Sequence, residues 1–132
     1  MDAPAAAPIA APPPAPARPR VVFWRNELAR GREALKDAFF DDPDTQRLLR
    51  EHARLVDRVV TGVWAEAGMP GDYALLAVGG YGRGQLYPHS DIDVLVLLPA
   101  ATDDVGASAI ERLFTALWDS GLELAHAVRT ID

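Results

Sequence analysis

Two aspartates at the start of an apolar run are the residues best suited to chemistry in this chain. Asp91 and Asp93 flank Ile92, and the run from Val94 to Leu98 follows. Because successive side chains of a strand point to opposite faces, we expect the two carboxylates to project together while Ile92 and Val94 face the core. Such carboxylates repel each other unless a cation lies between them, and Mg²⁺ prefers carboxylates with phosphate oxygens. The pair therefore predicts a magnesium site for phosphoryl or nucleotidyl transfer.

A glycine-rich segment before the aspartates supplies the other half of the pattern. Gly79 and Gly80 follow a short apolar run, and without a β-carbon their backbone can approach a phosphate chain closely. Ser90, directly before Asp91, is placed to bind a phosphate oxygen or to cap the turn, and Arg83 is placed to neutralise triphosphate charge. The segment is neither a Walker motif nor a dinucleotide fingerprint, because it lacks Gly-Lys-Ser/Thr and the dinucleotide glycine spacing.

Each half of the pattern also has a purely structural explanation. Two glycines after a strand usually form only a turn, and a single Asp-x-Asp usually faces solvent. Their combination in a strand, turn and strand favours a functional site.

The segment from Ala77 to Asp93, AVGGYGRGQLYPHSDID, resembles the signature of polymerase-β-like nucleotidyltransferases. It most closely resembles the catalytic motif of the bacterial bifunctional uridylyltransferase/uridylyl-removing enzymes, which act on the nitrogen-signalling protein PII. The segments 118–123 and 126–130 resemble the next characteristic block of that family. The resemblance covers roughly residues 21–132.

The resemblance implies a reaction and a set of roles. UMP would pass from UTP to a tyrosine hydroxyl of PII, with release of pyrophosphate. Gly79, Gly80 and Ser90 would hold the UTP phosphates, and Asp91 and Asp93 would bind Mg²⁺.

Nucleotidyltransferases of this superfamily commonly use a third carboxylate from a later strand. Glu123 is the candidate, because it alternates with Ala125 on one face of the expected third strand. His126 lies on the opposite face and is interpreted as structural, as are His52 and His89.

The elements that must position these residues follow from periodicity and capping signals. We expect a first helix over residues 25–40. A second helix is expected to begin with a cap at Asp42 and Pro43 at its first position, and to end at Gly68 and Pro70. A buried strand over 73–78, a turn over 81–88 with room for one helical turn, and a strand over 91–98 follow. A helix capped by Asp103 or Asp104 and ended by Gly121 precedes a strand over 122–129. Its expected buried positions are Ile110, Leu113, Phe114, Leu117 and Trp118. The order predicts a small α/β (α+β) fold with a mixed sheet.

Composition excludes several classes of protein. With 132 residues, 49% of them hydrophobic and 24% charged, the chain is expected to form one domain at most. The absence of cysteine excludes a disulfide scaffold, a thiolate zinc site and a cysteine nucleophile, and it fits a reducing cytoplasm. The net charge of −6 argues against a general nucleic-acid binder, and the longest apolar run, residues 94–98, is too short to cross a membrane.

Three regions are expected along the chain. Residues 1–20 form an Ala/Pro-rich tail without a core, residues 21–70 a helical lead-in, and residues 71–132 the nucleotidyltransferase core. The chain ends just after the third expected strand, which indicates an N-terminal fragment. By the resemblance, the HD hydrolase domain that removes UMP and the ACT domains would follow in family members.

Other functions remain open at this point. A minimal nucleotidyltransferase of the antitoxin or antibiotic-modifying type is one, although such enzymes begin close to the glycine motif. A non-catalytic module that binds nucleotide is another, and the two aspartates argue against it. A nucleic-acid polymerase is the weakest, because the chain is acidic.

Overall fold

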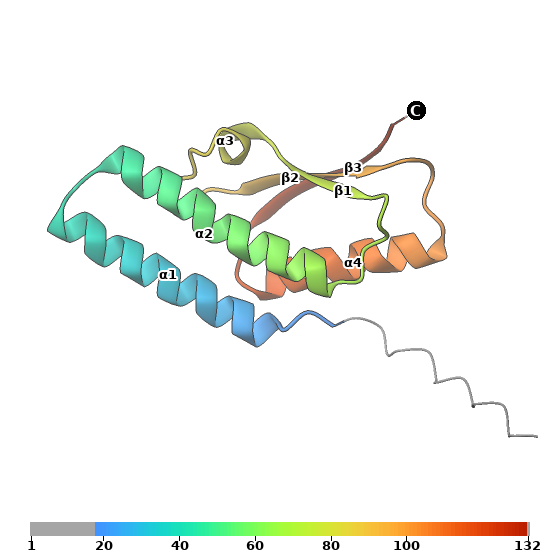
Figure 1. Cartoon of the computed structure of the whole chain (residues 1–132), viewed down its shortest axis with the longest axis horizontal. Coiled ribbons are helices and arrows are strands. Elements are labelled where there is room, and N and C mark those ends of the chain that lie inside the picture. Colours follow the sequence, from blue (N-terminus) through green and yellow to red (C-terminus); the bar gives the residue numbers. More distant parts are fainter. Residues whose placement is uncertain (1–17, 132) are drawn as a thin grey trace, which may run out of the picture.

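The computed structural model describes residues 18–131, in which three long helices pack on one face of a small sheet (Figure 1). The expected tail lies almost wholly outside these residues. The elements are α1 (Val21–Asp41), α2 (Thr45–Glu66), β1 (Ala74–Ala77), α3 (Gly79–Gly82), β2 (Ile92–Leu98), α4 (Asp104–Asp119) and β3 (Leu124–Thr130). The predicted α/β class with a mixed sheet is confirmed.

The sheet has the order β1-β2-β3, with β2 in the centre. β1 runs antiparallel to β2, and Ala77 pairs with Val94. β3 runs parallel to β2, and Ile92 pairs with Leu124. Parallel neighbours need a crossover connection, which α4 provides. The first residues of β2 and β3 therefore lie side by side, at the edge of the sheet that is formed by the ends of these strands.

Burial alternates along β2, as the sequence pattern predicted. The side chains of Ile92, Val94, Val96 and Leu98 are at most 2% exposed, whereas those of Asp93, Leu95 and Leu97 are half-buried. The buried face meets apolar side chains of the helices, including Val56, Val59 and Val63 of α2 and Leu113 and Leu117 of α4. Each such side chain contributes about 1.5–3 kcal/mol when fully buried. Asp93 thus lies on the face that these helices leave accessible.

The expected cap of the second helix is wrong. The N-cap is Asp44, whose Oδ1 accepts the Arg47 amide at 3.0 Å. Asp42 instead closes the preceding helix, because its own amide donates to the Ala38 carbonyl at 3.0 Å. Pro43 therefore lies before the cap. For α4, one of the two expected caps is confirmed, since the Asp103 side chain accepts the Gly106 amide at 2.7 Å.

Two expectations about burial are also wrong. β1 is not a buried strand, since Leu76 is 40% exposed and Val78, just after it, 39% exposed. β1 is an edge strand, and the three long helices lie on only one side of the sheet (Figure 1). Trp118, expected in the core of α4, is 46% exposed.

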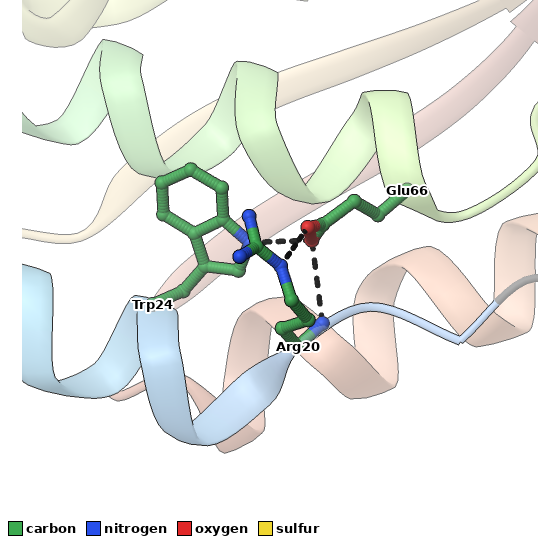
Figure 2. Close-up of polar contacts among 3 residues, drawn as sticks. All are labelled: Arg20, Trp24 and Glu66. Atoms are coloured by element: carbon green, nitrogen blue, oxygen red, sulfur yellow. Dashed lines mark hydrogen bonds and ion pairs between the residues drawn. The ribbon is translucent and has the colours of Figure 1, made fainter.

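A polar cluster joins the first turn of α1 to the last turn of α2 (Figure 2). Glu66 accepts hydrogen bonds from Trp24 Nε1 and Arg20 Nε, each at 2.6 Å, and from the Arg20 amide at 3.3 Å. Burial raises the pKa of Glu66, but these hydrogen bonds outweigh it and hold the pKa below its usual value. The cluster accompanies a helix that begins at Val21, earlier than the expected Arg25.

No helix within residues 18–131 combines the length and the apolar character needed to span a membrane.

Candidate active site

The start of β2 is bonded on both sides to segments that carry candidate residues. On one side, the Val78 amide donates to the Asp93 carbonyl at 3.0 Å, directly before the glycine pair. On the other, the Ile92 amide donates to the Glu123 carbonyl at 2.7 Å. The backbone thus brings the glycine turn, the aspartates and the residue before β3 to one edge of the sheet.

Gly79 lies directly against the side chain of Asp93. A β-carbon built on Gly79 would lie 2.6 Å from Asp93 Oδ2, and the residue has a φ of +59°. Both the space and the backbone conformation therefore require glycine. The lack of a side chain at residue 79 is therefore what lets the Asp93 carboxylate lie against this turn.

The glycine segment forms the single helical turn α3. The Gly82 amide donates to the Val78 carbonyl at 2.9 Å and the Arg83 amide to the Gly79 carbonyl at 3.2 Å. The turn lies at Gly79–Gly82 and so begins before the expected range of 81–88. Arg83 Nη2 lies 3.9 Å from the place that a β-carbon of Gly80 would take. The guanidinium expected to neutralise phosphate charge thus lies next to one of the expected phosphate-binding glycines.

The loop from α3 to β2 ends in a tight turn before Asp91. The Ser90 amide donates to the Tyr87 carbonyl at 3.1 Å, and His89 has a φ of +69°. A non-glycine residue rarely adopts this conformation, and the surrounding structure must hold it in place. Such residues gather at sites where a precise backbone path is needed.

The three candidate carboxylates have no protein partner within residues 18–131. Asp91 and Glu123 are exposed and Asp93 is half-buried, and none joins an ion pair or a side-chain hydrogen bond there. The same residues hold no group of three or more His, Asp or Glu side chains that could bind a metal ion. The structure therefore places Asp91 and Asp93 at the start of β2, with Glu123 outside a three-carboxylate cluster.

The donor chemistry at this edge fits a hard divalent cation. Asp93 in β2 and Asp91 directly before it supply hard oxygen ligands, and neither forms an ion pair within residues 18–131. The space that a side chain at residue 79 would need is already taken by Asp93 Oδ2, so this carboxylate lies directly against the glycine turn.

A chain of polar contacts centred on the buried His52, which reaches the glycine segment at Leu86, was not predicted. His52, expected to be merely structural, is 1% exposed and bonds the Leu86 carbonyl and Arg32. Burial lowers the pKa of the Arg32 guanidinium, and the charge of Glu123 acts against that shift. The sequence signal that could have indicated this contact was the position of His52 among the apolar residues of the expected second helix. The His126 ring stacks on Phe114 with centroids 4.2 Å apart, in agreement with its structural interpretation.

Comparison with known proteins identifies the kind of domain. Residues 63–128 match the family model described as nucleotidyltransferase domain. Three bacterial proteins named bifunctional uridylyltransferase/uridylyl-removing enzyme are similar to the chain. The one from Chromobacterium violaceum is 45% identical over 83% of this chain, that from Nitrosospira multiformis 47% over 81%, and that from Aromatoleum aromaticum 46% over 81%.

The chain spans only 12–13% of the length of these relatives. No solved structure matches the chain.

Proposed function

The chain belongs to the nucleotidyltransferase domain family, and on that premise we propose that it transfers UMP from UTP to a tyrosine hydroxyl of the PII protein. The observation that carries the proposal is the contact between the Gly79 backbone and the Asp93 carboxylate, at the edge where Asp91 also lies. UTP as donor agrees with relatives named as uridylyltransferases. PII as acceptor follows from the resemblance of the motif to the PII-modifying family.

The proposed reaction exchanges one phosphoester partner for another. The tyrosine oxygen forms a bond to the α-phosphorus of UTP, and the bond from that phosphorus to the oxygen bridging to the β-phosphate breaks. Pyrophosphate leaves with the bonding electron pair, and the hydroxyl proton is released. Negative charge grows on the phosphoryl oxygens and on the leaving group, so preorganised positive charge and hydrogen-bond donors accelerate the step.

The residues at the edge divide these tasks. Gly79 and Gly80 let the backbone approach the phosphates, Ser90 donates its hydroxyl to a phosphate oxygen, and Arg83 neutralises phosphate charge. This part of the site binds and orients the nucleotide.

Three acidic side chains complete the proposed machinery. Asp91 and Asp93 would hold Mg²⁺, which when bound offsets the growing negative charge and favours loss of the hydroxyl proton. Nucleotidyltransferase domains in general use a divalent metal. Glu123, which lies directly before β3 and outside a three-carboxylate group within residues 18–131, is the proposed third carboxylate. The cytoplasm is the proposed place of action, in keeping with the absence of cysteine.

The test is transfer of α-phosphate-labelled UMP from UTP to purified PII in the presence of Mg²⁺, with the whole protein that carries this chain. Asp91→Asn and Asp93→Asn should each abolish labelling and keep the wild-type melting temperature, because each removes a ligand charge from an accessible side chain. Asp72→Asn, a change at an exposed aspartate in the turn before β1, should label PII normally. Full labelling by the two site variants would refute the proposal, and labelled ATP and CTP would test the choice of nucleotide.

A further inference from the structure

A buried chain of hydrogen bonds joins α1, α2 and the loop that leads to Asp91. Arg32 Nε on α1 lies 3.2 Å from His52 Nε2 on α2, and His52 Nδ1 lies 3.0 Å from the Leu86 carbonyl oxygen. His52 and Leu86 are each 1% exposed. Buried polar contacts of this kind are costly to break, because the remaining partner is left without a hydrogen bond.

The donor pattern assigns the state of the imidazole. Arginine can only donate, so Nε2 accepts, and Nδ1 carries the hydrogen and donates to the Leu86 carbonyl. The ring is therefore neutral. In agreement, burial lowers the pKa of His52; the hydrogen bond to the Leu86 carbonyl raises it, and the nearby Arg32 and His89 side chains lower it further.

α2 holds the glycine segment at two points. The Tyr81 hydroxyl of α3 donates a hydrogen bond to the Asp57 carboxylate of α2, and the Leu86 carbonyl accepts a hydrogen bond from His52 of α2. Between these anchors the loop is exposed at Arg83. Within residues 18–131, no side chain forms a hydrogen bond to any residue between Leu86 and Asp91, so the bond from His52 is the nearest such anchor before Asp91. Loss of this hydrogen bond is expected to loosen residues 87–90, which lead to Asp91, while the buried Leu86 side chain still holds residue 86 in the core.

We propose that His52, supported by Arg32, is a positioning residue for nucleotidyl transfer, acting through the Leu86 carbonyl on the placement of Ser90 and Asp91. The inference rests on the proposed function. Neither side chain needs to touch the nucleotide. Since a misplacement of about 1 Å can cost about 100-fold in rate, a loosened loop is expected to lower kcat far more than it weakens UTP binding.

Three substitutions at His52 separate positioning from mere filling of the core. Asparagine places an amide N–H near the position of Nδ1 and keeps the donor for Leu86. Glutamine places an amide oxygen near Nε2 and keeps the acceptor for Arg32. Leucine keeps neither. His126→Asn is the matched control, because it changes a histidine that stacks on Phe114 of α4 and makes no side-chain hydrogen bond to the loop within residues 18–131.

The first measurement is amide hydrogen exchange of residues 84–90 in the whole protein without nucleotide or PII. We expect exchange there to be at least about tenfold faster in His52→Leu and His52→Gln, close to wild type in His52→Asn, and unchanged in His126→Asn. The second is steady-state transfer, where kcat should fall in the same order and KM for UTP should stay within about threefold.

The outcomes decide the proposal even if one variant does not fold. Wild-type exchange in His52→Gln, or exchange in a folded His52→Asn as fast as in His52→Gln, would overturn the positioning role. If the wild-type protein transfers no UMP, the proposed function fails, and the exchange order alone decides whether His52 positions the loop.

Discussion

Replacement of Gly79 by alanine tests whether the contact between the glycine turn and Asp93 matters for transfer. The new β-carbon would lie 2.6 Å from Asp93 Oδ2, whereas ordinary contacts of a β-carbon begin at 3.4 Å. The carboxylate must therefore retreat by roughly 1 Å to regain van der Waals contact. A displacement of that size in a reacting group costs about 100-fold in rate.

Backbone strain accompanies the clash and needs its own control. Gly79 has a φ of +59°, and an alanine there costs about 1–2 kcal/mol of stability. Gly84 has a φ of +69°, yet among residues 18–131 no atom beyond its own chain neighbours lies within 4 Å of the place a β-carbon would take. Gly84→Ala therefore pays the same strain without touching Asp93. The difference between the two variants isolates the contact.

The assay is the initial rate of UMP transfer to PII, paired with urea denaturation of each variant. We expect each variant to lose about 1–2 kcal/mol of unfolding free energy, because alanine is strained at a positive φ. Gly79→Ala should be about 100-fold slower than wild type, and Gly84→Ala within about threefold. Equal rates for the two alanine variants would refute the reasoning, because the clash with Asp93 would then have no consequence.

Three further predictions concern stability. Because the folded pKa of His52 is lowered, its stabilising contribution is present above its unfolded value of 6.5 and is lost as the pH falls below it, by at most about 1.4 kcal/mol per pH unit. Denaturation series from neutral to acidic pH should show a flatter profile for His52→Gln, and matching profiles would contradict the assignment. Trp24→Phe removes the 2.6 Å hydrogen bond to Glu66 and should cost about 1.5 kcal/mol in urea denaturation, whereas an unchanged midpoint would mean that water replaces the indole. Asp44→Ala should cost about 1 kcal/mol as loss of a helix cap, while Asp42→Ala should cost less than half of that; the reverse order in the same assay would restore Asp42 as the cap.

The aspartate pair and its strand were predictable because their signal is local. A period of two over Ile92–Leu98 is set by side-chain direction in a strand, and the core that covers one face acts on every second residue. The same rule leaves Asp93 on the accessible face. The helix caps were harder, since Asp42 and Asp44 both have suitable side chains. Which aspartate caps α2 depends on whether the Asp42 amide still donates a hydrogen bond to the last turn of α1, and the residue types do not show this.

The burial of β1 was not predictable from its residues. A run such as Leu75 to Val78 reads as buried strand whether one face or both are covered. Within residues 18–131 the long helices cover only one side of the sheet, which leaves Leu76 and Val78 partly exposed. Which face is covered depends on the packing of distant elements, not on the local pattern.

The contacts that hold the candidate site join residues far apart in the sequence, and they give helix α2 a role in positioning the glycine segment. His52 and Asp57 lie five positions apart on α2, and their partners Leu86 and Tyr81 lie five positions apart on the glycine segment. A helix rises about 7.5 Å over that interval, so α2 serves as a rigid spacer that fixes two points of a flexible, glycine-rich loop. Glycine lets the backbone approach a phosphate, but it also leaves the chain free to move. A glycine-rich turn therefore depends on anchors outside itself, and two side chains of α2 provide them here.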